Sequence, residues 1–125
     1  LQNPKKSIRV RISSNKEIIK MKKQVLISQP MKGMTTEQIR SNRQAAVDEI
    51  EALGCEVLDS VFDYESPEYT GLKNKPLFYL AKSFELIASK ADGVYFLKGW
   101  REARGCILEH DACLAYGVPV YYEAN

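Results

Sequence analysis

The chain has 125 residues, of which 45% are hydrophobic and 27% charged, close to the average of globular proteins. This composition excludes global disorder and fibrous structure, and the length suits one domain with its own core. The formal net charge of +2 is unevenly distributed. Residues 1–23 carry eight Lys/Arg and one Glu, a net of +7, whereas residues 24–125 carry ten Lys/Arg and fifteen Asp/Glu, a net of −5.

The basic leader, residues 1–20, allows two interpretations. It could be an arm that binds nucleic acid or an acidic surface. Alternatively, it is a non-native or upstream-translated extension, because MKKQVLIS from Met21 resembles a natural start that runs into a buried strand. We favour the extension, treat residues 21–125 as a single domain and do not expect nucleic acid as a partner. Alternating apolar residues in the leader could still form an edge strand: Ile8, Val10 and Ile12.

The cysteines predict a reducing compartment. Cys55, Cys106 and Cys113 are an odd, sparse set, which does not make a disulfide framework. No apolar run approaches the roughly 18 residues that span a bilayer, and the leader lacks the apolar region of a secretory signal. We therefore expect a cytoplasmic protein without a membrane partner.

Strands and helices are predicted to alternate along the chain. Gln24–Ser28 is a buried strand, and the capping-box spacing of Thr35 and Gln38 begins a helix that stops before Gly54. Its core face carries Ile39, Ala46, Ile50 and Leu53, with Arg40, Arg43, Glu49 and Glu51 mostly off that face. The remaining elements are a strand over 56–61, a polar loop over 62–75, a helix from Pro76 with inner residues Leu77, Leu80, Ala81, Phe84 and Ala88, a strand over 93–97, a helix over 106–116 ended by Gly117, and a strand over 118–123.

This βαβαβαβ order predicts an α/β protein with a small flavodoxin-like or Rossmann-like fold. It implies three layers, α/β/α, around a mainly parallel sheet with right-handed crossovers. Such folds bind ligands at the carboxyl ends of the strands, near the point where the strand order reverses. The loops QPMKGMT, after the first strand, and KGWREARG, after the third, are therefore the candidate binding loops.

The first of these loops has no dinucleotide or Walker motif. Lys32, Gly33 and the amides before the Thr35 cap could meet an anion at the helix N-terminus, or the segment could be a plain turn. The second loop is richer, because Trp100, Arg101, Arg104 and Gly105 precede a helix start. We interpret it as a phosphate cradle, with a solvated charged loop as the alternative.

Glu109 follows within about one turn of that helix start, where the helix dipole favours an ionised carboxylate. Such a group could act as a nucleophile at a sugar or stabilise an oxocarbenium-like transition state; it could equally be a residue placed there only by the dipole. Cys106, His110 and Cys113 share one helical face and could bind a metal, but we favour a small apolar stripe and expect no metal. No GxSxG nucleophile motif is present.

Three stretches together resemble a known family: LISQPMKG after MKK, KADGVYFLKGW, and RGCILEHDACLAYGVPVYYE. They are similar in order and spacing to the nucleoside 2-deoxyribosyltransferase-like superfamily, in particular to an uncharacterised bacterial and phage branch. The resemblance covers about residues 21–123. It implies cleavage of an N-glycosidic bond without a cofactor, and a homodimer or larger homo-oligomer.

The resemblance also implies roles for single residues. Glu109 matches the glutamate that attacks the anomeric carbon, and Asp92 matches the aspartate that opens the third strand and supports the nucleophile or the sugar hydroxyls. Gly105 matches the turn that contacts the sugar phosphate, while Gln29 and Lys32 fall in the loop that lines the nucleotide pocket. The backbone amides of residues 104–106 would hold the phosphate, with the side chain of Arg101 or Arg104 as charge partner, and the base would stack on one aromatic ring: Tyr95, Tyr79 or Trp100.

The sequence also departs from this superfamily. Active relatives commonly carry another acid in the helix before the third strand, whereas LFYLAKSFELIAS has no Asp and Glu85 comes late. The leading hypothesis is therefore an enzyme acting on nucleosides or nucleoside 5′-monophosphates, either as hydrolase or as transferase. The alternative is a nucleotide-binding or sensing module without turnover.

Overall fold

The computed structural model describes residues 22–61 and 67–124. The leader with its candidate edge strand, and the beginning of the polar loop over 62–75, lie outside these residues. Within them, strands and α-helices alternate as predicted, joined in part by short 3-10 turns η1 (Pro67–Tyr69) and η2 (Trp100–Glu102). The main elements are β1 (Gln24–Ser28), α3 (Thr36–Ala52), β2 (Glu56–Leu58), α4 (Lys75–Ser89), β3 (Gly93–Phe96), α5 (Arg104–Tyr116) and β4 (Val120–Tyr122).

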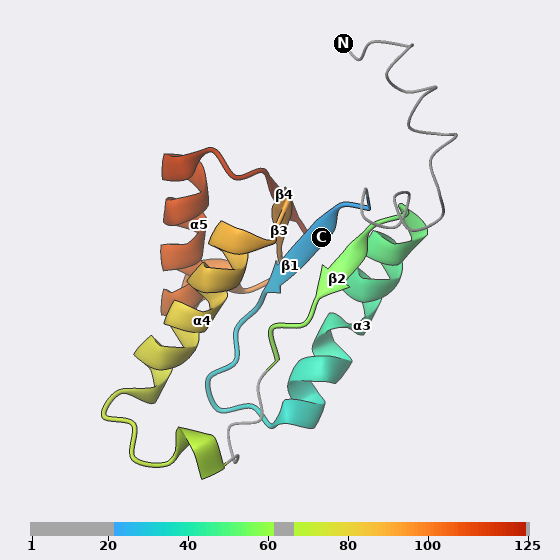
Figure 1. Ribbon diagram of the computed structural model, residues 1–125. Coiled ribbons are helices and arrows are strands. Elements are labelled where there is room, and N and C mark those ends of the chain that lie inside the picture. The colour runs from blue at the N-terminus through green and yellow to red at the C-terminus, as the bar shows by residue number, and fades with distance from the viewer. Residues whose placement is uncertain (1–21, 62–66, 125) are drawn as a thin grey trace, which may run out of the picture.

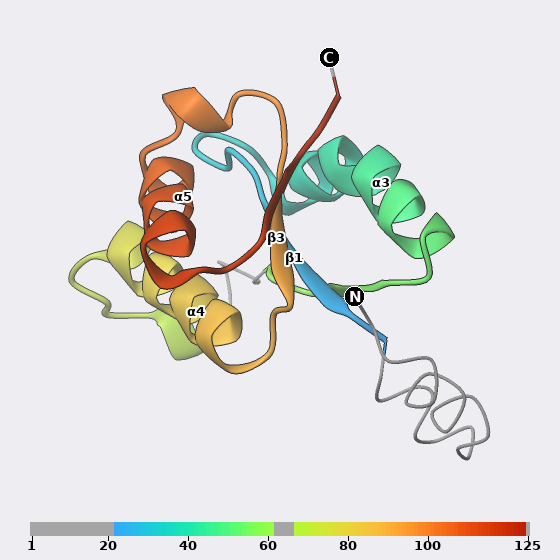
Figure 2. The same ribbon diagram turned by 90° about the horizontal axis from the view of Figure 1, so that it is seen from above.

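The four strands form one parallel sheet in the order β2-β1-β3-β4. Helix α3 covers one face, and α4 and α5 lie side by side on the other (Figures 1 and 2). This arrangement confirms the predicted three-layer flavodoxin-like or Rossmann-like fold. The chain leaves β1 toward β2 on one side and returns to β3 on the other, so the strand order reverses between β1 and β3.

Two apolar clusters hold the layers together, because successive residues of β1 and β3 point to opposite faces of the sheet. The cluster under α3 contains Val25, Ile27, Ala46, Ile50, Tyr95 and Leu97. The cluster under α4 and α5 contains Leu26, Ile87, Val94, Phe96 and Cys113. The paired strands are therefore apolar on both faces, as expected for a sheet that is covered by helices on both sides.

Helix α3 begins with the predicted capping box: the backbone N–H of Gln38 donates to Thr35 Oγ1 at 3.1 Å, and the backbone N–H of Thr35 donates to Gln38 Oε1 at 2.9 Å. Its predicted core face was wrong at two positions. Arg43 is buried because it continues the stripe of Ile39, Ala46 and Ile50 at intervals of three and four residues, whereas Leu53 is exposed because it is the C-cap beyond the sheet.

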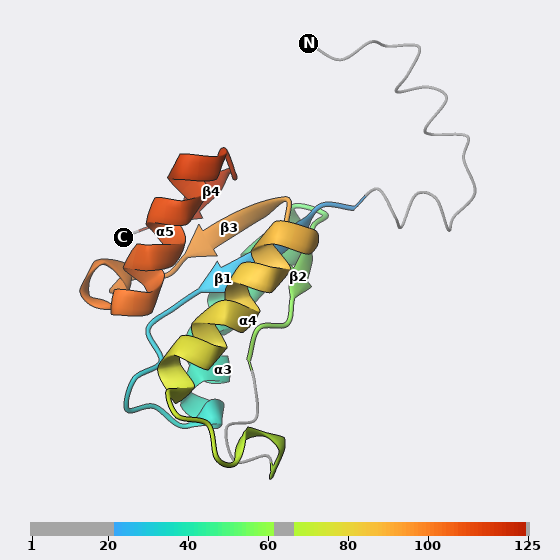
Figure 3. The same cartoon turned by 60° about the vertical axis from the view of Figure 1, so that its left-hand side comes forward.

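The predicted inner face of α4 was also partly wrong. Leu77, Ala81 and Ala88 are exposed, whereas Ile87 is buried and Leu80 and Phe84 are half-buried. The helix must face both the sheet and α5, which runs beside it (Figure 3). Its inward side is consequently rotated from the stripe that apolar periodicity alone predicted.

Three elements have a boundary that differs from the prediction by two residues or more. The pairing of β2 with β1 begins at Glu56 and ends at Leu58. The backbone therefore separates from the sheet before Ser60 and Val61, although both residues remain buried. Helix α5 begins at Arg104 instead of Cys106, and β4 is limited to the residues that pair with β3. Among the residues that the structure describes, no helix has the length and apolarity needed to cross a bilayer.

Candidate functional site

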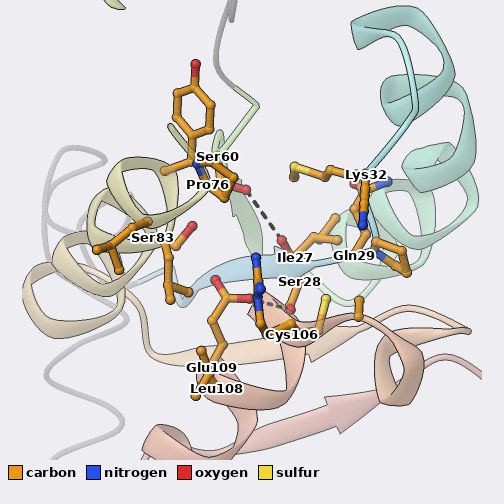
Figure 4. A pocket seen from close by; sticks show the side chains of 18 of the residues that line it. Ile27, Ser28, Gln29, Lys32, Ser60, Pro76, Ser83, Cys106, Leu108 and Glu109 are labelled. Atoms are coloured by element: carbon orange, nitrogen blue, oxygen red, sulfur yellow. Dashed lines mark hydrogen bonds between the residues drawn. The ribbon is translucent and has the colours of Figure 1, made fainter. Parts of the chain in front are cut away.

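A cavity of about 830 Å³ lies beyond the carboxyl end of β1, between the amino-terminal part of α4 and the start of α5 (Figure 4). It is lined by residues 27–32, by Ser60 after β2, by one side of α4, and by residues 102–106 with Leu108 and Glu109. This is the edge of the sheet at which the strand order reverses, where open α/β folds bind their ligands. Its volume is that of a small-molecule site.

Glu109 is the buried carboxylate of this cavity, with only 6% of its surface exposed. The hydroxyl of Ser28 donates to Glu109 Oε1 at 2.6 Å, so the end of β1 fixes a side chain from α5 (Figure 4). Burial raises the pKa of Glu109 above its ordinary value of 4.5, and hydrogen bonds from Ser28 and Ser83 offset part of the rise. Desolvation therefore opposes the effect of the helix dipole, which was expected to favour the ionised form of Glu109.

Sequence reasoning missed Ser28 and Ser83, the two cavity residues whose side chains hydrogen-bond to Glu109. Ser28 was detectable in principle, since it is the polar residue that ends the buried run of residues 25–28. Ser83 carried no such signal, because its approach to Glu109 depends on how α4 packs beside α5. In Figure 4, Ser83 lies to one side of the Ser28–Glu109 pair, and Gln29 and Lys32 lie to the other.

The first turn of α5 forms part of the cavity wall. Arg104, Gly105 and Cys106 all line it, and backbone N–H groups in a first helical turn have no acceptor within the helix. A Cβ atom at Gly105 would meet only Leu80 Cδ1, at 4.0 Å, so packing does not require a glycine here. The structure thus brings three of the predicted phosphate-binding residues to the same cavity as Glu109.

The first loop contributes Gln29 and Lys32 to the cavity, but not Gly33. Gln29 is buried, and its side-chain nitrogen donates to the carbonyl oxygen of Ile39 at 3.0 Å. Gly33 is exposed with a φ of +77°, a backbone conformation that glycine adopts without strain. Gly33 thus belongs to the turn before α3, and the structure does not bring it to the cavity.

Trp100 and Arg101 also lie outside this cavity. They line a smaller hollow of about 350 Å³ beside β4, where the Arg101 guanidinium lies 5.0 Å from the Trp100 ring centre. Trp100 packs against His110, with ring centres 4.2 Å apart, and His110 Nε2 lies 2.6 Å from the Tyr122 hydroxyl. Because η2 turns these two side chains toward β4, the structure does not support the expected phosphate and base contacts from them.

Asp92 lies at the opposite end of the sheet from Glu109. The backbone N–H of Gln24 donates to Asp92 Oδ2 at 2.8 Å, and the backbone N–H of Asp92 donates to the Gln24 carbonyl at 2.7 Å. Asp92 precedes β3, and the amino ends of parallel strands meet at the same edge of a sheet. We correct its expected catalytic role, because it links the starts of β1 and β3 instead.

The two tyrosines considered for base stacking have different environments. Tyr95 is buried under α3, where its hydroxyl donates to Glu49 at 2.9 Å and burial raises its pKa to about 12. It is therefore not a stacking platform. Tyr79 lines the cavity from α4 and keeps that possibility.

The three residues considered as metal ligands, Cys106, His110 and Cys113, lie in three different environments. Cys106 lines the cavity, where burial raises the pKa of its thiol to about 11, and Cys113 belongs to the core, with a pKa likewise raised to about 11. His110 packs in the aromatic cluster with Trp100 and Tyr122. Within residues 22–61 and 67–124, no three His, Cys, Asp or Glu side chains are grouped to hold a metal ion.

Comparison with protein families matches residues 23–122 to DUF4406, described as a domain of unknown function. The chain belongs to the DUF4406 family. Neither the curated proteins nor the solved structures contain a match to it. The DUF4406 region includes the whole sheet and every residue that lines the larger cavity.

Proposed function

We propose that this DUF4406 protein cleaves the N-glycosidic bond of nucleosides and, by preference, of nucleoside 5′-monophosphates. The observation that carries the proposal is a carboxylate, Glu109, buried in a nucleotide-sized cavity beside the positive end of a helix. The resemblance to the nucleoside 2-deoxyribosyltransferase-like superfamily supports it, because the matching glutamate of that superfamily performs this reaction.

In the proposed reaction, an ionised Glu109 oxygen attacks the anomeric carbon of the sugar. The carbon–nitrogen bond breaks, and its electron pair leaves with the base, which takes a proton from solvent. Water or a second base then attacks the same carbon, loses its proton to solvent and releases the carboxylate, so that the two steps together are a hydrolysis or a base exchange. The hydrogen bond from Ser28 holds Glu109 Oε1 in place through both steps.

The start of α5 is the proposed phosphate site. The backbone amides of residues 104–106 and the Arg104 side chain would hold a 5′-phosphate, and the helix dipole favours negative charge there. Glu109 lies on the same helix, one to two turns further on, a separation that suits the short distance between a 5′-phosphate and the anomeric carbon. Arg101 has no part in this proposal, because it lies beside β4.

A second candidate, a nucleotide sensor without turnover, has one observation in its favour. Of the two acidic residues that line the cavity in the part of the chain that the structure describes, only Glu109 is buried, and Glu102 is exposed. A buried acid that could protonate the leaving base is thus missing among these residues. Tight nucleotide binding without release of base, measured by calorimetry and chromatography, would identify such a sensor.

The decisive experiment is incubation with ribo- and deoxyribonucleosides and their 5′-monophosphates, followed by chromatography for free base. We expect release from at least one monophosphate and its loss in Glu109→Ala. No release from any substrate, or full activity in Glu109→Ala, would contradict the catalytic proposal. The homo-oligomer that the resemblance implies is a separate proposal, which sedimentation of the purified chain would test.

A further inference from the structure

Gln29 has an unusual position at the end of β1. It follows a strand whose inner residues are apolar, yet it is 5% exposed and lines the larger cavity. Neighbouring residues of a strand point to opposite faces, so Ser28 reaches α5 on one face while Gln29 reaches α3 on the other. The cavity therefore extends across the end of the sheet, from Glu109 on one side to Gln29 on the other (Figure 4).

The orientation of the Gln29 amide follows from its partner. The carbonyl oxygen of Ile39 can only accept a hydrogen bond, so the Gln29 nitrogen, at 3.0 Å, must face it. This contact turns the other amide atom, Gln29 Oε1, away from the Ile39 carbonyl. The oxygen is buried and has no hydrogen-bond partner among residues 22–61 and 67–124. Buried polar atoms in native proteins nearly always have a hydrogen-bond partner. We therefore expect a donor for this acceptor when a ligand is bound.

We infer that Gln29 Oε1 is a specificity-determining acceptor that binds one neutral N–H or O–H donor of the ligand. The inference rests on the proposed function, from which it takes the ligand class, a nucleotide. In an adenine nucleotide, two kinds of donor fit this chemistry: the exocyclic amino group of the base and a hydroxyl of the ribose. A phosphate dianion does not fit, because it offers only acceptors. Gln29 thus has a different task from Lys32 and the start of α5.

The test measures binding of four nucleotides by calorimetry, in the Glu109→Gln background so that no base is released. Adenosine 5′-monophosphate is the parent, and each of the others lacks one donor: purine riboside 5′-monophosphate lacks the amino group, and the 2′-deoxy and 3′-deoxy nucleotides lack one hydroxyl each. We expect one deletion to weaken binding about tenfold, as for a single buried hydrogen bond. The deletion that does so identifies whether the base or the sugar is the donor.

The same series is then measured with Gln29→Met, which keeps the side-chain length and removes the acceptor. We expect the tenfold difference to disappear, because the parent loses the bond that the deleted nucleotide already lacks. Gln44→Met is the matched control, since Gln44 is exposed on α3 and its side-chain nitrogen donates to Asp48 of the same helix. Circular dichroism checks the folding of both variants.

The results separate the two proposals. If the four nucleotides bind but Gln29→Met leaves every ratio unchanged, the assignment of Gln29 is wrong and the proposed function is untouched. If Gln29→Met does not fold, the four affinities measured with the Glu109→Gln protein, which keeps Gln29, decide the question. Equal affinities for all four nucleotides would overturn the assignment. If none of them binds, the nucleotide site itself is wrong, and the proposed function and the role of Gln29 fall together.

Discussion

The two ends of the parallel sheet hold acidic residues in contrasting environments. At the amino end, Asp92 is exposed and its carboxylate accepts the backbone N–H of Gln24. At the carboxyl end, Glu109 is buried in a cavity, with a pKa that burial raises. The resemblance to one superfamily predicted a catalytic role for both residues. Among the residues that the structure describes, only Glu109, at the carboxyl end, lines a cavity that could receive a ligand. The end of the sheet, more than the matching motif, separates a structural acid from a candidate catalytic one.

The largest expected effect is the difference between Glu109→Gln and Asp92→Asn. If Glu109 is the nucleophile, its amide variant should release base about 10⁴-fold more slowly, as typically follows removal of a catalytic nucleophile or its partner. Asp92→Asn keeps an oxygen that can accept from Gln24, so base release should stay within about twofold, the size of an ordinary surface substitution. Initial rates of base release with a saturating monophosphate measure both. A loss in Asp92→Asn as large as that in Glu109→Gln would contradict the proposed division between the two ends.

A smaller effect separates two arginines of the same loop. Arg104 lines the cavity, whereas Arg101 lies over Trp100 beside β4. Arg104→Ala should weaken binding of a nucleoside 5′-monophosphate roughly 10- to 100-fold, the worth of a hydrogen bond to a charged group, and should leave binding of the unphosphorylated nucleoside nearly unchanged. Arg101→Ala should change neither affinity and is the matched control. Equal losses for nucleotide and nucleoside in Arg104→Ala would show that Arg104 does not bind the phosphate.

The sequence predicted the fold well because each layer leaves a local signal. The apolar strand Gln24–Ser28, the capping box of Thr35 and Gln38, and Gly117 with a φ of +73° at the end of α5 all lie where they were predicted. The parallel order then follows from the alternation of strands and helices.

The site was predicted only in part, because side-chain direction depends on packing between elements. One cavity brings together six of the predicted site residues, as expected for positions near the carboxyl ends of the strands. They are Gln29, Lys32, Arg104, Gly105, Cys106 and Glu109. Trp100 and Arg101 lie just before α5 in the sequence, the helix that carries Glu109. However, η2 turns their side chains toward β4 and away from the cavity. Ser83 could not be found without knowing that α4 lies beside α5.

The serines of the cavity should change how activity depends on pH. Base release requires ionised Glu109, so activity should rise with pH through a pKa that lies above 4.5. Since the hydrogen bond from Ser28 lowers this pKa, Ser28→Ala should shift the acid limb of the profile to higher pH and reduce the rate roughly tenfold at the pH of half-maximal activity. Ser83→Ala should shift the limb in the same direction by less. A limb that stays in place in both variants would show that neither hydroxyl acts on the titrating group.

The smallest expected effect concerns stability and tests Glu109 without any substrate. Its pKa is higher in the folded chain than the ordinary value of 4.5, so the folded state holds the proton more tightly than the unfolded state. Protonated Glu109 therefore contributes stability that is fully present below about pH 4.5 and is lost as the pH rises through the folded pKa. Glu109→Gln cannot ionise and does not lose this stability. The difference between its free energy of unfolding and that of the unmodified chain should therefore shift in favour of the variant from pH 4 to pH 8. Urea unfolding at a series of pH values measures the gain, and parallel curves for the two proteins would mean that burial at the carboxyl end does not perturb Glu109.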